Sequence, residues 1–65
     1  MKIQYFEDTD TLYILFSTKS PVETRDLDED TLLDLDENGR LCSMTIEHAK
    51  NRVGLPEVDY EKIPA

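Results

Sequence analysis

Apolar and polar residues alternate at the start of the chain with a period of two, which is typical of β-strands. The pattern covers residues 2–5 (KIQY) and 11–16 (TLYILF), and the polar stretch EDTD lies between them. Tyr13 and Leu15 add apolar groups on the second face of the later segment. We therefore expect two strands joined by a short turn. The second strand should lie inside a sheet and be covered on its far side by a helix or a subunit.

Three further segments favour β-structure. Residues 31–36 (TLLDLD) and 40–46 (RLCSMTI) flank the pair Asn38 and Gly39, which is a strong hairpin signal because both residues tolerate the positive φ that tight turns demand. Residues 22–27 (VETRDL) carry a weaker signal, and their alternating charges are typical of an edge strand that resists aggregation. The pattern thus predicts four to five antiparallel strands.

The pattern changes near the end of the chain. Residues 47–53 (EHAKNRV) favour a helix of one to two turns, which Gly54 ends in a left-handed conformation, with Pro56 beyond it. The tail, residues 54–65, has too few apolar residues to build a core of its own. We expect an α+β domain over residues 1–53, an antiparallel β-meander with a short C-terminal helix, followed by this tail.

The chain has 65 residues, enough for one small domain in which apolar burial barely offsets the entropy lost on folding. Cys42 is the only cysteine, so no disulfide within the chain can staple the fold. We therefore expect a homo-oligomer or a hetero-complex. The sequence has no apolar run of signal-peptide or membrane-span length, which predicts a soluble, cytoplasmic protein.

Acidic residues outnumber basic ones by 15 to 7, which gives a net charge of −8. This charge repels nucleic-acid phosphates and anionic lipids, so contacts with nucleic acid or membrane are disfavoured. Eight of the acids fall between Glu23 and Glu37, where Arg25 is the only base, and they would attract a basic partner surface. The plainer interpretation is a solvated surface that keeps the monomer soluble.

Six residues are candidate contacts to such a partner. A tyrosine joins the acids because tyrosine, with its apolar body and polar tip, is enriched at interfaces. Packing in a core is nevertheless the more common use of the side chain, at Tyr5 and Tyr13 as well. The candidate partner-binding residues are Glu23, Asp26, Asp28, Glu29, Asp30 and Tyr60.

The stretch DLDENG spaces Asp34, Asp36 and Asn38 as the first ligands of an EF-hand calcium loop, with Gly39 at the sixth position. The twelfth position, which should supply a bidentate glutamate, is Thr45, and the flanking segments favour strands instead of helices. On a strand, Asp34 and Asp36 point the same way and line the solvent face. We interpret the stretch as a hairpin turn and keep a weak calcium site as the alternative.

The remaining polar residues give little support to catalysis or metal binding. Asp8 and Asp10 lie in the first polar turn, where aspartates commonly close a turn onto their own backbone. His48 and Cys42 are too few for a zinc site unless subunits share it. A nucleophilic Cys42 with His48 as its base is less plausible than a small buried thiol beside Met44. We expect no catalytic residues and no cofactor.

Three motifs occur in order over residues 1–50: M-K-I-x-Y, D-x-L-Y-I and L-D-x-D-x-x-G-R-L. The matching positions are Met1, Lys2, Ile3, Tyr5, Asp10, Leu12, Tyr13, Ile14, Leu33, Asp34, Asp36, Gly39, Arg40 and Leu41. Together they resemble a widespread bacterial and archaeal family of very small proteins classed as a domain of unknown function. The resemblance implies a small β-rich domain with a short helix and no assigned activity. The chain departs from the family pattern after Leu41, where members are more aliphatic and often carry an acid in place of Thr45.

The resemblance also implies a gene context, because such proteins are often encoded beside small toxin-like proteins and are suspected antitoxins. We therefore predict a non-enzymatic, antitoxin-like module that neutralises a basic partner such as an RNA-cleaving toxin. Its carboxylates would occupy the positions of substrate phosphates. A weak calcium-binding module and a structural homodimer stay open as alternatives, and an enzyme that depends on Cys42 is the weakest of them.

Overall fold

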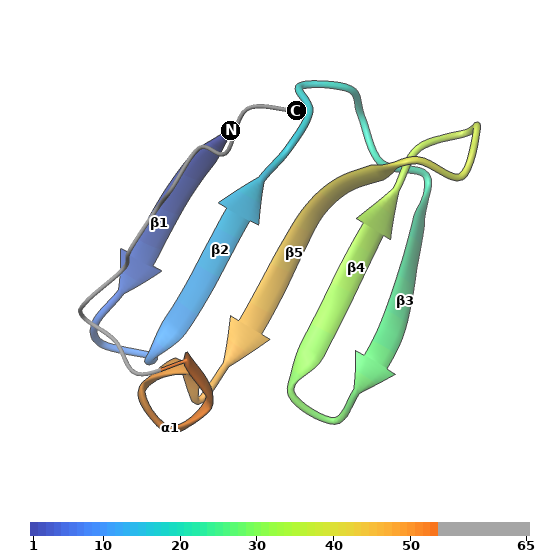
Figure 1. Cartoon of the computed structure of the whole chain (residues 1–65). Coiled ribbons are helices and arrows are strands. Elements are labelled where there is room, and N and C mark those ends of the chain that lie inside the picture. Colours follow the sequence, from blue (N-terminus) through green and yellow to red (C-terminus); the bar gives the residue numbers. More distant parts are fainter. Residues whose placement is uncertain (54–65) are drawn as a thin grey trace, which may run out of the picture.

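Five strands and one short helix form in the part of the chain that the computed structural model describes, residues 1–53 (Figure 1). The elements are β1 (Lys2–Phe6), β2 (Thr11–Leu15), β3 (Glu23–Asp28), β4 (Thr31–Leu35), β5 (Leu41–Glu47) and α1 (Ala49–Val53). All neighbouring strands run antiparallel. The expected α+β meander is therefore confirmed, and its weakly signalled edge strand is β3. The expected tail, with the candidate contact Tyr60, lies outside the described residues.

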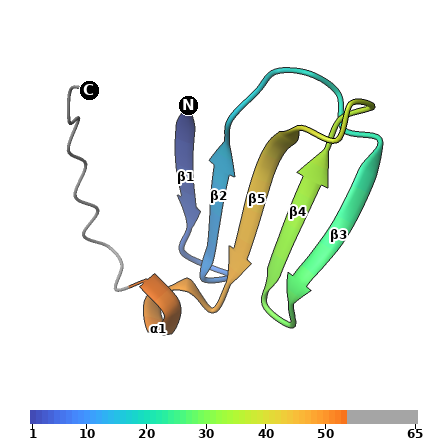
Figure 2. The same cartoon turned by 45° about the vertical axis from the view of Figure 1, so that its right-hand side comes forward.

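The strands follow the order β1-β2-β5-β4-β3 across the sheet. The hairpins β1–β2 and β3–β4 thus flank β5 on its two sides (Figure 2). The connection from β2 to β3 crosses the ends of β5 and β4. Its first residues, Phe16 and Ser17, donate their N–H groups to the carbonyl of Cys42, and the N–H of Val22 donates to the carbonyl of Leu35. Strand β2 has a neighbour on each side, as its two apolar faces predicted.

One face of the sheet carries a continuous apolar row. Because opposed residues of antiparallel strands share a face, Ile3, Ile14, Met44 and Leu33 lie side by side across four strands, and Arg25 ends the row on β3. The most buried apolar residues of the described part are Leu12, Leu35, Cys42 and Ala49. The core therefore follows the inner strands β2, β4 and β5 and the start of α1.

The second face of the sheet is mixed. Its middle row contains one residue from each strand, in the order Gln4, Tyr13, Thr45, Leu32 and Asp26. The ends of this row, on β1 and β3, are polar and exposed, whereas the inner positions are half-buried. The two edge strands therefore present comparable positions, Gln4 and Asp26, on the same face.

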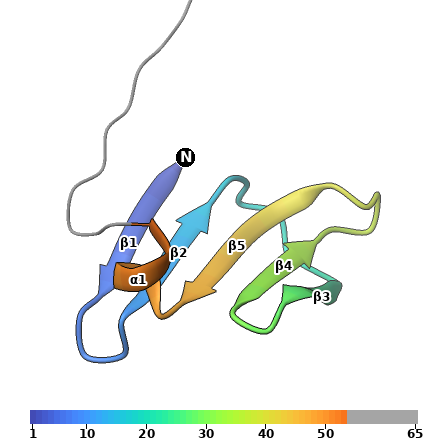
Figure 3. The ribbon, with the colours of Figure 1, turned by 60° about the horizontal axis from the view of Figure 1, so that its bottom comes forward.

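Helix α1 begins at Ala49, two residues after the expected start at Glu47. Glu47 still belongs to the sheet, because it pairs with Thr11 of β2. His48 follows with a positive φ of 55°, a conformation that interrupts both strand and helix. The helix lies beside the β1–β2 end of the sheet (Figure 3).

The turn between β4 and β5 forms at DLDENG, as the sequence predicted. The N–H of Gly39 donates to the carbonyl of Asp36 over 3.0 Å, and the N–H of Asp36 donates to the carbonyl of Arg40 over 2.9 Å. The expectation of a positive φ at both Asn38 and Gly39 is wrong, because only Gly39 of the two adopts one, at 76°. This pattern is that of a β-turn followed by a left-handed glycine, a longer loop than the two-residue hairpin turn.

Replacing Gly39 by alanine tests the left-handed position. A Cβ built there meets nothing within 4 Å, so the substitution adds backbone strain without a clash. We expect Gly39→Ala to lower the free energy of unfolding by about 1 kcal/mol, measured by urea denaturation. The control Gly39→Asn should cost less, since asparagine tolerates this conformation. Equal stability of Gly39→Ala and the wild type would contradict the assignment.

Candidate functional site

The acidic candidates lie at one edge of the sheet. Every residue of β3 is exposed, and β3 pairs with β4 alone among the described strands. Glu23, Asp26 and Asp28 lie on this strand, and Glu29 and Asp30 lie in the turn that follows it. We call these five residues the acidic edge. A feature that was only a local charge cluster in the sequence is therefore one continuous border of the fold.

The single base of this border is held by a neighbouring acid. Arg25 Nε lies 2.7 Å from Oε2 of Glu23, and Arg25 Nη2 lies 3.3 Å from Oε1. The hydrogen bond lowers the pKa of the Glu23 carboxyl and raises the pKa of the Arg25 guanidinium. Both side chains are about half exposed or more, so the pair contributes little to stability. Because Arg25 is paired with Glu23, the remaining negative charge of the acidic edge lies toward the β3–β4 turn.

The β3–β4 turn is ordered by one of its own aspartates. Asp28 Oδ1 accepts the backbone N–H of Asp30 over 2.9 Å, as in an Asx-turn. The pairing register of β3 and β4 shifts between Asp26 and Asp28, so Leu27 lies at a bulge and is exposed. Glu29 is also exposed. The turn therefore presents carboxylates and one apolar side chain to solvent.

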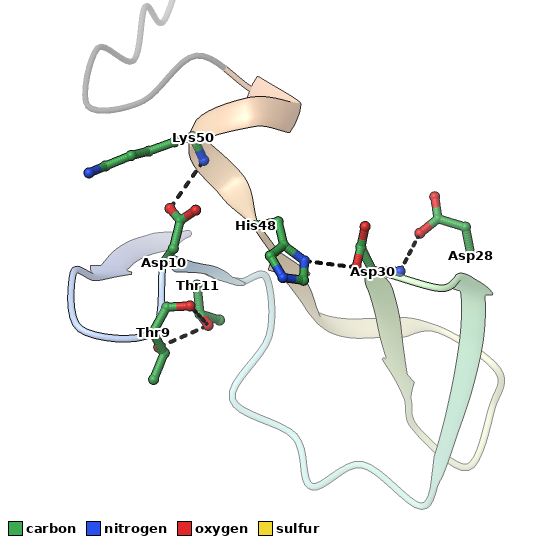
Figure 4. A network of polar contacts seen from close by, with 7 residues as sticks. All are labelled: Thr9, Asp10, Thr11, Asp28, Asp30, His48 and Lys50. Carbon is green, nitrogen blue, oxygen red and sulfur yellow. Dashed lines mark hydrogen bonds and ion pairs between the residues drawn. The ribbon is translucent and has the colours of Figure 1, made fainter.

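Asp30, at the end of this turn, also binds the junction between β5 and α1 (Figure 4). Its carbonyl accepts the N–H of Glu47 over 2.8 Å, and its Oδ1 lies 2.9 Å from Nδ1 of His48. The hydrogen bond and the negative charge of Asp30 raise the pKa of His48. Asp30 is half-buried. Asp30 therefore links the β3–β4 turn to the junction between β5 and α1.

Asp10, in the turn after β1, binds the same junction from the other side (Figure 4). Its carbonyl accepts the N–H of Ala49 over 3.0 Å, and its Oδ1 accepts the N–H of Lys50 over 3.1 Å. The Tyr5 hydroxyl donates to Asp10 Oδ1 over 2.6 Å, which raises the pKa of Tyr5 to about 12 and lowers the pKa of Asp10. The expectation that Asp10 closes its own turn is therefore wrong, because its carboxylate accepts hydrogen bonds from Lys50 of helix α1 and Tyr5 of strand β1.

A short repeat in the sequence marks this arrangement and was missed by pattern reasoning. The tripeptide Asp-Thr-Leu occurs at residues 10–12 and again at residues 30–32. Strands β2 and β4 begin at the threonine of each copy and pair with β5 from its two sides. Each copy thus places an aspartate beside the end of β5, where its carbonyl and its carboxylate face the junction.

The first carboxylate of DLDENG belongs to a polar row on the mixed face. Asp34 Oδ1 accepts the hydroxyl of Thr24 over 2.7 Å, and Asp34 Oδ2 accepts the hydroxyl of Ser43 over 2.8 Å. These three residues oppose one another on β3, β4 and β5. Both oxygens of Asp34 are therefore used in cross-strand hydrogen bonds.

The second carboxylate of DLDENG points into its own turn. Asp36 is only 5% exposed, and its Oδ1 accepts the N–H groups of Asn38 and Arg40, both over 2.9 Å. These bonds lower the pKa of Asp36. The expectation that Asp34 and Asp36 both line the solvent face is wrong, because Asp36 lies past the end of β4 and is buried. The two carboxylates accept hydrogen bonds from separate sets of donors. This favours the turn interpretation over a cation bound by both carboxylates.

Cys42 and His48 lie far apart. They are six residues apart along β5 and its extension, which corresponds to about 20 Å of extended chain. Cys42 is 1% exposed, and burial, with the nearby charge of Asp36, raises the pKa of its thiol. The side chain of His48 faces Asp30 instead. Within residues 1–53, no group of three or more histidine, cysteine, aspartate or glutamate residues is arranged to hold a metal ion.

Comparison with known proteins gives one match. A family model described as "Protein of unknown function (DUF2283)" matches residues 2–50, most of the chain. No curated protein and no solved structure matches. The match agrees with the expected family of proteins of unknown function, and the link to toxins stays a prediction. Among the described residues, no helix is long and apolar enough to cross a membrane.

The contact between His48 and Asp30 predicts a pH dependence. His48 is the only histidine, so NMR reads its ring titration directly. We expect a pKa above 6.5 that falls in Asp30→Asn, while Asp26→Asn on exposed β3 leaves it unchanged. The contact contributes stability that is complete below pH 6.5 and is lost as the pH rises through the raised pKa. An unaltered pKa in Asp30→Asn would refute the pairing.

The turn interpretation of DLDENG predicts no response to calcium. A cation at Asp36 would have to displace the N–H groups of Asn38 and Arg40 from its carboxylate. We expect no change in melting temperature at millimolar calcium, measured by thermal unfolding with magnesium as the control. A calcium-specific rise that disappears in Asp34→Asn with Asp36→Asn would instead establish the cation site.

Proposed function

The chain belongs to the DUF2283 family of proteins of unknown function, and from this premise we propose that it is a non-enzymatic module that binds a basic protein partner through its acidic edge. The observation that carries the proposal is the placement of five acids on one exposed strand and its turn. The only base among them, Arg25, is paired with Glu23. With five acids and one base, the border carries a net negative charge.

The basic residues of the described part support this assignment by where they lie. Apart from Arg25 and Arg52, they are distributed over β1, the β2–β3 connection, the β4–β5 turn and the start of α1. They are Lys2, Lys19, Arg40 and Lys50. The β3–β4 turn thus carries Asp28, Glu29 and Asp30 and no lysine or arginine of its own. Local negative charge of this kind orients a basic partner toward β3 before contact and raises its rate of association.

We further propose that the partner is a basic toxin that cleaves RNA, which the acidic edge neutralises by occlusion. A protein that binds RNA needs a positively charged surface to hold the phosphates. Carboxylates of the acidic edge would occupy those positions and exclude the substrate. The bulged Leu27, exposed beside the acids, adds an apolar contact at the centre of the charged border. Neutralisation then needs no catalytic group on this chain.

Charge reversal at the acidic edge tests the proposal. Proteins captured from the native cell lysate at low and moderate salt supply the basic partner, whose association is then measured with purified variants. We expect Asp26→Lys with Glu29→Lys to slow association by about tenfold and to flatten its salt dependence. A partner that cleaves RNA should be inhibited by the wild type and should escape the variant.

The matched control reverses two exposed acids elsewhere. Glu7→Lys with Asp8→Lys, in the β1–β2 turn, changes the net charge by the same four units, from −8 to −4. Association should then stay close to the wild-type rate, because the change lies away from β3. Equal slowing by both pairs would mean that only total charge matters, and the acidic edge would be rejected as the binding surface.

A further inference from the structure

The two edges of the sheet differ in how they are protected against pairing with another strand. Natural edge strands are commonly blocked by charged side chains, bulges and nearby prolines. Edge strand β3 has all three, since charged residues occupy four of its six positions, its register shifts between Asp26 and Asp28, and Pro21 lies just before it. Strand β3 is therefore poorly suited to add a further strand.

The opposite edge, β1, lacks most of these features. It pairs with β2 without any register shift, and β2 is its only neighbour among the described strands. Lys2 is its only charged residue. Ile3 and Phe6 remain 45% and 46% exposed, one on each face, and Met1 beside them is also exposed. Within residues 1–53, strand β1 thus combines a backbone edge that no strand covers with exposed apolar side chains.

We propose that β1 is a homodimer interface, at which the β1 strands of two copies pair antiparallel and join two sheets into one of ten strands. An antiparallel pair of identical strands is closed by a two-fold axis, so the interface is self-complementary. With the axis at Gln4, Lys2 of each copy faces Phe6 of the other, and Ile3 faces Tyr5. No like charges are opposed, and the apolar row that begins at Ile3 continues across the axis.

The charge distribution favours a second copy at β1 over any pairing at β3. Each chain carries a net charge of −8, which opposes association. In a β1-to-β1 dimer the two β3 strands lie nine strand spacings apart, about 43 Å, which is several times the screening length at physiological salt. Pairing through β3 would instead bring both acidic edges into contact. The dimer therefore keeps both acidic edges open, one at each end.

This inference does not depend on the proposed function, because it needs no basic partner. Cross-linking of an introduced thiol tests it without any partner protein. Gln4→Cys places a cysteine at the axis, where opposed residues of antiparallel strands are 4.5 to 5.5 Å apart, within disulfide range. Asp26→Cys is the matched control on β3, in the same cross-sheet row. The native Cys42 is buried, so the new thiol is the accessible one.

We expect Gln4→Cys to form a disulfide-linked dimer with oxidised glutathione, at twice the 7.5 kDa chain mass, and Asp26→Cys to stay mostly monomeric on a non-reducing gel. Sedimentation gives a second readout in which no covalent bond is formed. The wild type should shift toward the dimer mass at high concentration, Gln4→Arg should raise the dissociation constant at least tenfold, and Asp26→Arg should not. A wild type that sediments as a monomer at millimolar concentration, or cross-linking at position 26 in preference to 4, would overturn the proposal.

Discussion

The pairing of β5 on both of its edges is the interaction on which the rest of this small fold depends. A strand whose backbone groups face two sides needs hydrogen-bond partners on both, and β2 and β4 supply them. Each partner belongs to a hairpin, so the position of β5 also sets β1 and β3 at the outer edges. The turns of the same hairpins then hold the chain as it leaves β5, through Asp30 at His48 and Asp10 at Ala49. The order of the strands, the start of α1 and the position of the charged edge strand thus all depend on β5.

Most elements of the fold could be predicted from the sequence because the alternation of apolar and polar residues is local. The order of the strands could not be predicted in the same way. Thr11 and Glu47 pair across 36 positions of sequence, and no residue type marks a strand for a particular distant neighbour. The sequence pattern predicts the start of the helix two residues too early for a related reason. Glu47 suits a helix by composition, but its pairing with β2 keeps it in the sheet.

The candidate site could likewise be predicted from the sequence only where the signal is local. The acids of residues 23–30 lie close together in sequence, so their gathering on one strand and turn could be anticipated. The environments of Asp10, Asp34 and Asp36 could not, because their donors come from elements that only tertiary pairing brings near, or from a loop conformation set by Gly39. The calcium-like spacing in DLDENG arises because hairpin turns favour aspartate or asparagine beside a glycine, and a calcium loop uses the same residue types as ligands around its glycine. Spacing alone does not distinguish the two.

The central strand of the sheet is also the last of the described strands to be synthesised. While residues 41–47 are still inside the ribosome, β2 and β4 each expose the edge that β5 will later cover. Two-stranded hairpins are marginal in water, so the sheet gains most of its stability in one late step when β5 is inserted. A nascent chain with open edges is at its most prone to aggregate during that interval. The charged side chains of β3 are already present by then, and charges on an edge strand discourage its pairing with another unfinished chain.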